Sequence, residues 1–233
     1  MRITFNQHSQ VIAGISERSD GSMVWWNKKP IDKVVRQNRD RYFKKEGIDP
    51  KRVVAGGIAH SKHVAVVTEQ DAGRYLLNTD ALVTNVSNLF LSITTADCLP
   101  VYYYNPLKKC IGIAHAGWQG LTKGILENVV QKLHQSYDSK PKDLFVTIEP
   151  HIQVCHYEVG NEVAILFNKQ NVKQRNKHLF VDLANEAKLR LRKLGVKQIS
   201  INPICTYCES KRFFSARHDK IEPLQGMVAY IGL

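Results

Sequence analysis

The sequence predicts an α/β (α+β) fold: a layered sandwich of mixed β-sheets covered by helices, in a single domain. Three observations support this prediction. Strand-like and amphipathic helical segments interleave along the 233 residues, many strand-like runs follow one another directly, and no linker-like stretch divides the chain. The length suits one large domain whose core needs no disulfide or metal. We therefore expect one domain over residues 1–233, without a doubly wound sheet.

The first part of the chain is predicted to contain a strand pair and a helix. Residues 2–6 and 10–16 are strand-like and lead into an Asp-Gly turn. Residues 31–47 have helical spacing, and Gly47 offers a stop signal. The apolar face of this helix is expected to contain Val34, Val35, Tyr42 and Phe43.

The middle of the chain is predicted to be rich in strands. Strand-like runs cover residues 52–60, 63–69, 81–86, 90–97, 101–106 and 110–117. The last two runs are typical of a hairpin with Asn105-Pro106 at its turn. The period-2 alternation of a strand puts Tyr102 and Tyr104 on one face and Tyr103 on the other, and we expect all three to pack in the core.

Helices and strands alternate in the remainder of the chain. Amphipathic patterns predict helices at residues 121–137, 161–170 and 183–195. Strand-like runs lie at residues 143–150, 198–207 and 227–233.

The formal net charge is +12, from 33 basic and 21 acidic residues. The basic residues are spread over 27–45, 173–178 and 188–197. We interpret them mainly as solvated faces, with attraction of anions such as phosphate as the alternative. A nucleic-acid binder usually concentrates its charge on one base-reading element, and none is recognisable, so we expect no nucleic-acid partner.

The sequence shows no signal peptide, and no apolar stretch is long enough to cross a bilayer. Its five cysteines are sparse and odd in number. We therefore expect a cytoplasmic protein without a membrane partner, whose thiols are free or bound to metal.

Three strand-end stretches carry residues that bind metals: His60 with His63, Asp97 with Cys98, and His115. Ligands in layered α/β folds collect at strand ends and in the loops beyond them. One thiolate and two imidazoles make a set that zinc accepts, and a fourth position open to water or substrate is the catalytic arrangement. These residues are too far apart for a short zinc motif, so unrelated strand-end residues are the alternative.

Several segments together resemble one family in order and composition. They are IAHS (58–61), ADCLPV (96–101), IGIAHAGWQG (111–120), CHYEVG (155–160) and CTYCESKRFFSARHD (205–219). The family is the laccase-domain family of polyphenol oxidoreductase-like proteins, which are also described as purine nucleoside phosphorylases. The resemblance runs from about residue 11 to the C-terminus, and its combination of Ala-Asp-Cys with Ala-His-Ala-Gly-Trp is quite specific.

The resemblance implies that His60, Cys98 and His115 are zinc ligands and catalytic residues, with copper as the alternative metal. Asp97 is grouped with these catalytic residues as one that orients a ligand or a loop. The implied reaction is phosphorolysis of purine nucleosides (adenosine, inosine, guanosine and 5′-methylthioadenosine), with deamination of adenosine beside it. We expect these nucleosides and phosphate as partners, and a monomer or homodimer.

Phosphorolysis also needs an anion site, and the resemblance places Arg18 and Arg217 there. The guanidinium fork matches phosphate oxygens. The alternative is that Arg18 pairs only with Asp20, and Arg217 only with Asp219.

A proton donor must assist the leaving purine at N7. Asp97, His151, Glu158 and His218 are candidates, among which the sequence does not choose. Glu158 has the alternative of capping a helix that begins near Gly160.

Several positions depart from the family's pattern. Gln119 stands where an arginine is usual, which removes a positive charge near His115. Ile58 replaces a glutamine, and Glu149 and His151 stand where glycine and alanine are usual. We therefore expect intact metal ligands but an altered substrate rim.

Two other functions compete with the phosphorylase. A copper polyphenol oxidase needs several coppers and paired histidines, yet the nine histidines include no His-x-His. A non-catalytic zinc- or nucleoside-binding protein would explain the altered rim.

The segment Cys205-x-x-Cys208 resembles a redox or zinc pair, but a structural zinc ribbon needs a second pair, and the chain has no other Cys-x-x-Cys. We expect Cys110 and Cys155 to be ordinary buried residues.

Overall fold

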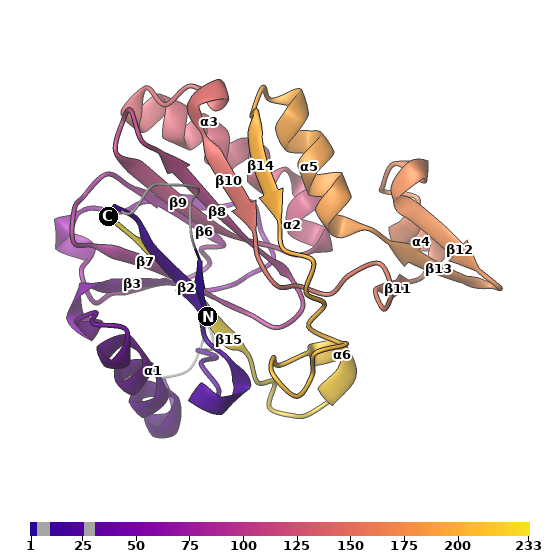
Figure 1. Ribbon diagram of the computed structural model, residues 1–233, viewed down its shortest axis with the longest axis horizontal. Helices are drawn as coiled ribbons and strands as arrows, with labels where there is room; N and C mark the ends of the chain where they lie inside the picture. The colour runs from indigo at the N-terminus through magenta and orange to yellow at the C-terminus, as the bar shows by residue number, and fades with distance from the viewer. Residues whose placement is uncertain (4–9, 26–30) are drawn as a thin grey trace.

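Two six-stranded β-sheets packed face to face form the body of the protein (Figure 1). The computed structural model describes residues 1–3, 10–25 and 31–233. Helices cover the outer face of each large sheet, and a small third sheet projects from one end of the molecule. The predicted layered sandwich of mixed sheets, in a single domain, is confirmed.

The first sheet has the strand order β1-β2-β15-β7-β3-β5. Its strands are β1 (Arg2–Ile3), β2 (Ile12–Ile15), β15 (Met227–Gly232), β7 (Phe90–Thr95), β3 (Val53–Gly56) and β5 (Tyr75–Leu76). β3 is parallel to both β7 and β5, and the other neighbours are antiparallel. The predicted pairing of the first two strands is confirmed, although residues 4–6 of the predicted strand lie outside the described residues.

The second sheet has the strand order β14-β10-β8-β9-β6-β4. Its strands are β14 (Gln198–Ile201), β10 (Phe145–Ile148), β8 (Leu99–Asn105), β9 (Cys110–Ala116), β6 (Ala81–Thr84) and β4 (Val64–Val66). β8 and β9 form the predicted hairpin. β14 runs parallel to β10, so the loops that follow these two strands leave from the same edge of the sheet.

The tyrosines of β8 confirm the predicted alternation. Tyr102 and Tyr104 pack between the two large sheets, whereas Tyr103 packs on the opposite face against the covering helices. The buried Tyr102 hydroxyl donates a hydrogen bond to the Gly14 carbonyl at 2.9 Å, which joins the two sheets and satisfies a buried polar group.

Helix α1 (Lys33–Lys45) packs two aromatic side chains on the first sheet. The predicted apolar face is wrong at its first turn, because Val34 is 61% exposed. The buried stripe instead contains Arg39, which donates to the Met23 carbonyl at 3.0 Å and to Ser92 Oγ at 3.1 Å. A pattern that counts only apolar residues misses a buried arginine that has found partners.

The second sheet is covered by α2 (Trp118–Lys123), α3 (Ile125–Tyr137) and α5 (Leu183–Lys193). The single helix predicted from residue 121 is broken at Gly124, which has a φ of +88°. This left-handed residue ends α2 and allows α3 to start in a new direction.

A three-stranded antiparallel sheet, which the sequence analysis did not predict, projects at the right of Figure 1. Its strands are β11 (Glu158–Val159), β13 (His178–Val181) and β12 (Val172–Arg175). The helix predicted over residues 161–170 is wrong beyond its first turn, α4 (Asn161–Ala164). The small sheet could not be predicted from hydrophobic periodicity, because its strand β12 is largely exposed and shows no apolar alternation.

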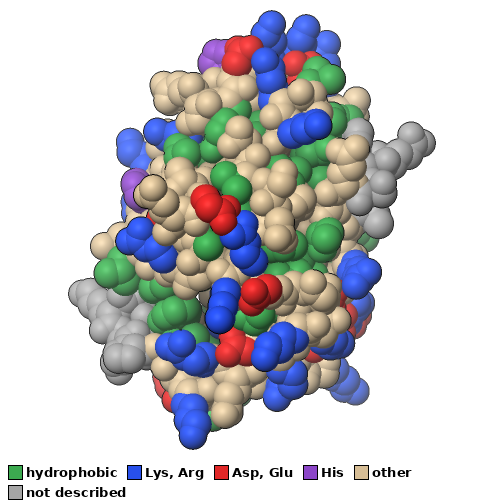
Figure 2. All heavy atoms as spheres, turned by 90° about the vertical axis from the view of Figure 1, so that its left-hand side faces the viewer, with side chains coloured by type: hydrophobic (Ala, Val, Ile, Leu, Met, Phe, Trp, Pro, Cys, Tyr) green, Lys and Arg blue, Asp and Glu red, His purple; other side chains and the backbone are tan. Residues whose placement is uncertain are grey.

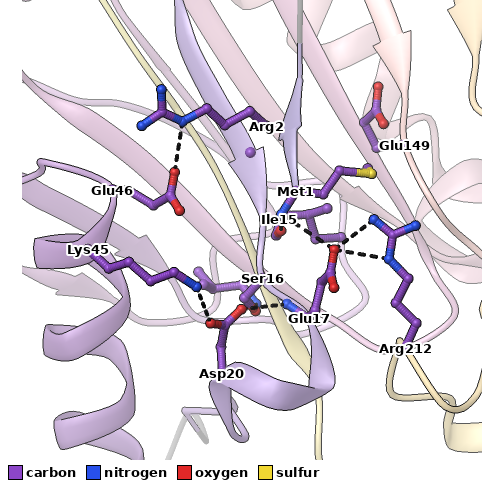
Figure 3. Close-up of polar contacts among 12 residues, drawn as sticks. Met1, Arg2, Ile15, Ser16, Glu17, Asp20, Lys45, Glu46, Glu149 and Arg212 are labelled. Atoms are coloured by element: carbon purple, nitrogen blue, oxygen red, sulfur yellow. Dashed lines mark hydrogen bonds and ion pairs between the residues drawn. The ribbon is translucent and has the colours of Figure 1, made fainter.

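Ion pairs tie the turn at residues 17–20 to two other parts of the chain (Figure 3). Glu17 accepts from Arg212 Nη2 at 2.7 Å, and Asp20 accepts from Lys45 Nζ at 3.1 Å. These contacts fix the backbone on either side of Arg18.

Lysine and arginine side chains spread over the face in Figure 2, with acidic side chains among them. Away from this view, residues 173–178 are all exposed, which agrees with the interpretation of that basic segment as a solvated face. Among the described residues, no helix is both long enough and apolar enough to cross a membrane.

Candidate metal centre

His60, Cys98 and His115 converge where the two large sheets meet a loop. Cys98 lies in the turn between β7 and β8, and His115 lies on β9 opposite Pro100. His60 follows β3 in a left-handed conformation, with a φ of 52°. The ligand atoms of the three side chains all lie within 4.8 Å of one another. His115 is buried, Cys98 is half-buried and His60 is exposed, so the cluster has an open side.

Asp80, which the sequence analysis did not single out, orients two of these ligands. Its fully buried carboxylate accepts hydrogen bonds from the amides of Ala59, His60 and Ser61 at 2.8–3.2 Å. His115 Nδ1 donates to Asp80 Oδ1 at 3.2 Å, which leaves Nε2 for a metal. Carboxylates fix histidine ligands in this way at many zinc sites. The one sign of Asp80 in the sequence is its place in the segment NTDALVTN (78–85), just before a strand-like run.

The charges around the cluster favour a cation. Burial disfavours the imidazolium of His115, but Cys98 and Asp80 outweigh burial and raise the pKa of His115 to about 9. Burial opposes the charged form of Asp80, but hydrogen bonds from His115 and Ser61 outweigh it and lower the pKa of Asp80. Desolvation and the neighbouring His115 lower the pKa of His60.

The raised pKa of His115 predicts that metal affinity increases with pH. The metal-free protein holds a proton on His115 below about pH 9, and a metal must displace it. We expect the apparent affinity for zinc to weaken by about tenfold or more per unit of pH below that value. Titrations against a competing chelator at several pH values measure the slope, and a flat profile would contradict the prediction.

Gly117 passes so close to the cluster that a side chain does not fit. A Cβ at this position would lie 2.8 Å from Cys98 Sγ and 3.5 Å from His60 Nδ1. A glycine here therefore keeps the space beside both ligands open.

We expect Gly117→Ala to weaken zinc binding roughly 10- to 100-fold, because overpacking costs about 1–3 kcal/mol. Competition titration at constant pH measures the change. Gly120→Ala is the matched control, since a Cβ there would meet its nearest neighbour at 3.4 Å. Equal losses in both variants would show that general helix damage, not crowding of Cys98, is responsible.

Asp97 holds two loops beside the cluster. Its Oδ1 accepts from Thr206 Oγ1 at 2.6 Å, and its Oδ2 accepts from the Arg217 amide at 2.8 Å. Burial raises the pKa of Asp97 against the opposing effect of these hydrogen bonds. Asp97 has a φ of 86°, so it lies in a turn and not in the regular strand predicted for residues 90–97. These contacts agree with a residue that orients a loop.

Arg217 lies at the exposed rim, next to Tyr157. Its Nη1 donates to the Glu158 carbonyl at 2.8 Å, and its guanidinium lies 5.3 Å from the centre of the Tyr157 ring. Burial and, after it, the charge of Cys98 raise the pKa of Tyr157, whereas the charge of Arg217 lowers it. The Tyr157 hydroxyl is therefore close enough to both the thiol and the guanidinium to be influenced by each of them. Within the described part of the chain no carboxylate forms an ion pair with Arg217, and the alternative partner Asp219 is engaged elsewhere.

Arg18 pairs with Asp219 and not with Asp20. Its Nη2 donates to Asp219 Oδ2 at 2.6 Å and to the Phe213 carbonyl at 3.1 Å. Its guanidinium also lies 4.4 Å from the centre of the Phe214 ring. Arg18 therefore holds the segment from which Arg217 projects.

Glu149 and His151 lie inside the protein and not at a substrate rim. His151 Nδ1 donates to the Glu149 carbonyl at 2.7 Å, and its Nε2 lies 3.1 Å from Gln153 Nε2. Burial lowers the pKa of His151, the Glu149 carbonyl holds its Nδ1 proton, and Gln153 occupies its Nε2, so the imidazole is not placed to protonate a purine. The Glu149 carboxylate accepts from Thr147 and Asn202, and burial raises its pKa.

The other two proton-donor candidates have surface partners. Glu158 pairs with His178 at 2.7 Å and does not cap α4, whose N-cap residue is Gly160. His218 contacts Asp219 at 3.1 Å through Nδ1 and Ser210 at 3.2 Å through Nε2.

A family model for the multi-copper polyphenol oxidoreductase laccase matches residues 22–233. The chain belongs to this laccase family. It is 29% identical to the purine nucleoside phosphorylase YlmD of Bacillus subtilis, over 99% of this chain and 91% of that protein. It is 32% identical to the purine nucleoside phosphorylase YfiH of Escherichia coli, over 80% of this chain and 76% of that protein.

Two solved crystal structures share the fold of this chain. The crystal structure of the hypothetical protein YfiH of Bacillus licheniformis, 28% identical, matches with a TM-score of 0.91 over 100% of this chain and 96% of that chain. YlmD from Geobacillus stearothermophilus, 26% identical, matches with a TM-score of 0.89 over 96% of this chain and 92% of that chain.

A lysine lies close to Gln119, the residue that was expected to remove a positive charge near His115. Lys123 lies one turn later on α2. Lys123 Nζ donates to the His60 carbonyl at 2.7 Å and to Gln119 Oε1 at 3.2 Å. A positive charge therefore still lies beside the cluster.

Proposed function

We propose that this protein is a zinc-dependent purine nucleoside phosphorylase. Its substrates would be phosphate and adenosine, inosine, guanosine or 5′-methylthioadenosine, and its products the free base and ribose 1-phosphate. The observation that carries the proposal is the open cluster of His60, Cys98 and His115, in a chain whose relatives are named purine nucleoside phosphorylases.

The donor set of the cluster fits zinc. One thiolate and two imidazoles are ligands that zinc prefers, and three protein ligands leave a position for substrate. Asp80 fixes the tautomer of His115, and Gly117 keeps the space beside Cys98 open. When bound, zinc supplies a Lewis acid that polarises an oxygen of the substrate. Copper also accepts imidazole and thiolate, so metal analysis belongs to the test.

Arg217 is the residue that we assign to phosphate. In phosphorolysis the bond from ribose C1′ to the purine nitrogen breaks, and a bond from C1′ to a phosphate oxygen forms. A guanidinium can hold two oxygens of the incoming phosphate at once. Asp97 and Arg18 act as positioning residues, because they hold the Arg217 amide and the segment around Asp219.

The test is incubation of purified, metal-analysed protein with adenosine, with and without phosphate, followed by chromatography. Adenine and ribose 1-phosphate that form only with phosphate would support the proposal. Inosine that forms without phosphate would make the protein a deaminase. No product from zinc-loaded protein would indicate a binding protein, and phenol oxidation by copper-loaded protein would indicate an oxidase.

We expect Arg217→Ala to raise the KM for phosphate about 10- to 100-fold, the effect of losing one charge-assisted hydrogen-bonding partner. The KM for adenosine should change much less. Arg192→Ala is the matched control, because Arg192 Nη1 also donates to a carbonyl, that of Lys197, at 2.7 Å. An unchanged KM for phosphate in Arg217→Ala would remove this residue from the phosphate site.

A further inference from the structure

A second cluster of metal-binding side chains lies in the loops that follow β10 and β14. Cys155 and His156 belong to the loop between β10 and β11, and Cys205 and Cys208 belong to the loop after β14. Because β10 and β14 are parallel neighbours, their loops leave from one edge and meet. A β-bridge between His151 and Cys205 joins them.

The four ligand atoms already lie at the separations of a metal site. Cys155 Sγ is 3.5 Å from Cys205 Sγ and 3.8 Å from Cys208 Sγ. His156 Nδ1 is 3.2 Å from Cys155 Sγ and 3.3 Å from Cys208 Sγ. A tetrahedral zinc with bonds of about 2.3 Å to sulfur and about 2.0 Å to nitrogen sets edges of roughly 3.8 and 3.5 Å.

We infer that Cys155, His156, Cys205 and Cys208 bind one zinc ion in a closed, four-coordinate structural site. Four protein ligands leave no position for a substrate, which distinguishes this site from the cluster at Cys98. The site could not be recognised from the sequence, because the partner of Cys205-x-x-Cys208 is not a second Cys-x-x-Cys. The other two ligands are the adjacent pair Cys155-His156, about 50 residues earlier in the chain.

Neighbouring groups prepare these ligands for a metal. The Gln153 amide donates to Cys205 Sγ at 3.4 Å, which stabilises negative charge on the sulfur. The His156 ring stacks on Tyr207 with centroids 4.1 Å apart and an interplanar angle of 12°, so its orientation is fixed. Its Nδ1 faces two of the sulfurs.

A disulfide is the competing use of these thiols. A disulfide bond has sulfurs about 2.05 Å apart, whereas the two Cys155 contacts are 3.5 and 3.8 Å. One disulfide would leave the third thiol and His156 without a role. A zinc ion uses all four groups and offsets most of the negative charge of the three thiolates.

The zinc ion would join the loop that carries Tyr157 and Glu158 to the loop that leads to Arg217. Those loops also meet through protein contacts, such as the β-bridge of His151 with Cys205 and the hydrogen bond of Arg217 with the Glu158 carbonyl, and the metal would add to them. Since the metal binds the folded form, its loss should lower the thermal stability of the whole chain.

The experiment removes the first centre and asks whether zinc remains. The full chain is produced with zinc as Cys98→Ala and as Cys98→Ala/Cys208→Ser, and zinc per chain is measured after gel filtration. Cys208 is exposed, so its replacement should leave the fold intact. We expect one equivalent in the first protein and none in the second, with a lower melting temperature in the second. Equal zinc contents, or no zinc in Cys98→Ala, would overturn the inference.

Two further measurements identify the ligands and the oxidation state of the thiols. Cobalt(II) bound to Cys98→Ala should give the intense visible absorption of a tetrahedral thiolate site, and Cys208→Ser should abolish it. Cys98→Ala/Cys110→Ala is the matched control, since Cys110 is buried outside both clusters, and it should keep its zinc. Alkylation after chelation and denaturation should modify every remaining cysteine, and a disulfide among Cys155, Cys205 and Cys208 would also overturn the inference.

Discussion

On the proposed function, Cys98→Ala is expected to lose both the zinc of the first centre and phosphorolysis. The thiolate is the one anionic ligand of the cluster, and two imidazoles remain after its removal. Loss of a residue that only hydrogen-bonds to a metal ligand typically lowers metal affinity by about 10- to 100-fold. Because Cys98 would be a ligand itself, we expect its loss to lower the affinity by more than about 100-fold. Zinc analysis of the purified protein and the rate of adenine release with phosphate measure the two losses.

Cys110→Ala is the control for this variant. Cys110 is a buried thiol on β9, the strand that also carries His115, but it lies outside the cluster. It should keep both its zinc and its activity. A Cys98→Ala protein that retains full activity would show that the reaction does not need this centre.

The three candidate ligands could be singled out from the sequence, whereas the groups that orient them could not. His60, Cys98 and His115 stand out because imidazole and thiolate at strand ends are unusual and because the surrounding motifs resemble a family. Asp80 precedes β6, and its role depends on a loop whose amides turn toward one carboxylate. Such a contact follows from the path of the backbone, which no local pattern encodes.

The second cluster was hidden for a related reason. Cys205 and Cys208 were visible as a pair, but their partners came from a loop that only the parallel pairing of β14 with β10 brings near. The prediction that Glu149 and His151 lie at a substrate rim was wrong, because both side chains are buried and hydrogen-bonded inside the protein. Charged and polar residues are usually expected at the surface, and the structure overrides that expectation where their hydrogen bonds are satisfied.

Asp80→Asn is expected to weaken the first centre while the protein stays folded. Asparagine keeps one acceptor oxygen but turns an NH2 group toward the donors on its other side, which are His115 and the His60 amide at Oδ1, or Ser61 at Oδ2. We expect zinc affinity to fall roughly 10- to 100-fold. The metal-free protein should lose on the order of 2–4 kcal/mol of unfolding free energy, because buried donors are left unpaired. Chelator competition and chemical denaturation measure the two effects.

Asp182→Asn is the matched control for this substitution. Asp182 caps α5 by accepting from the Asn185 amide at 2.9 Å, and asparagine caps helices about as well as aspartate. It should therefore change neither quantity appreciably. If Asp80→Asn loses stability but keeps wild-type zinc affinity, the carboxylate serves the loop at residues 59–61 and not the metal. If it loses affinity with little change in stability, its main role is to hold His115 for the metal.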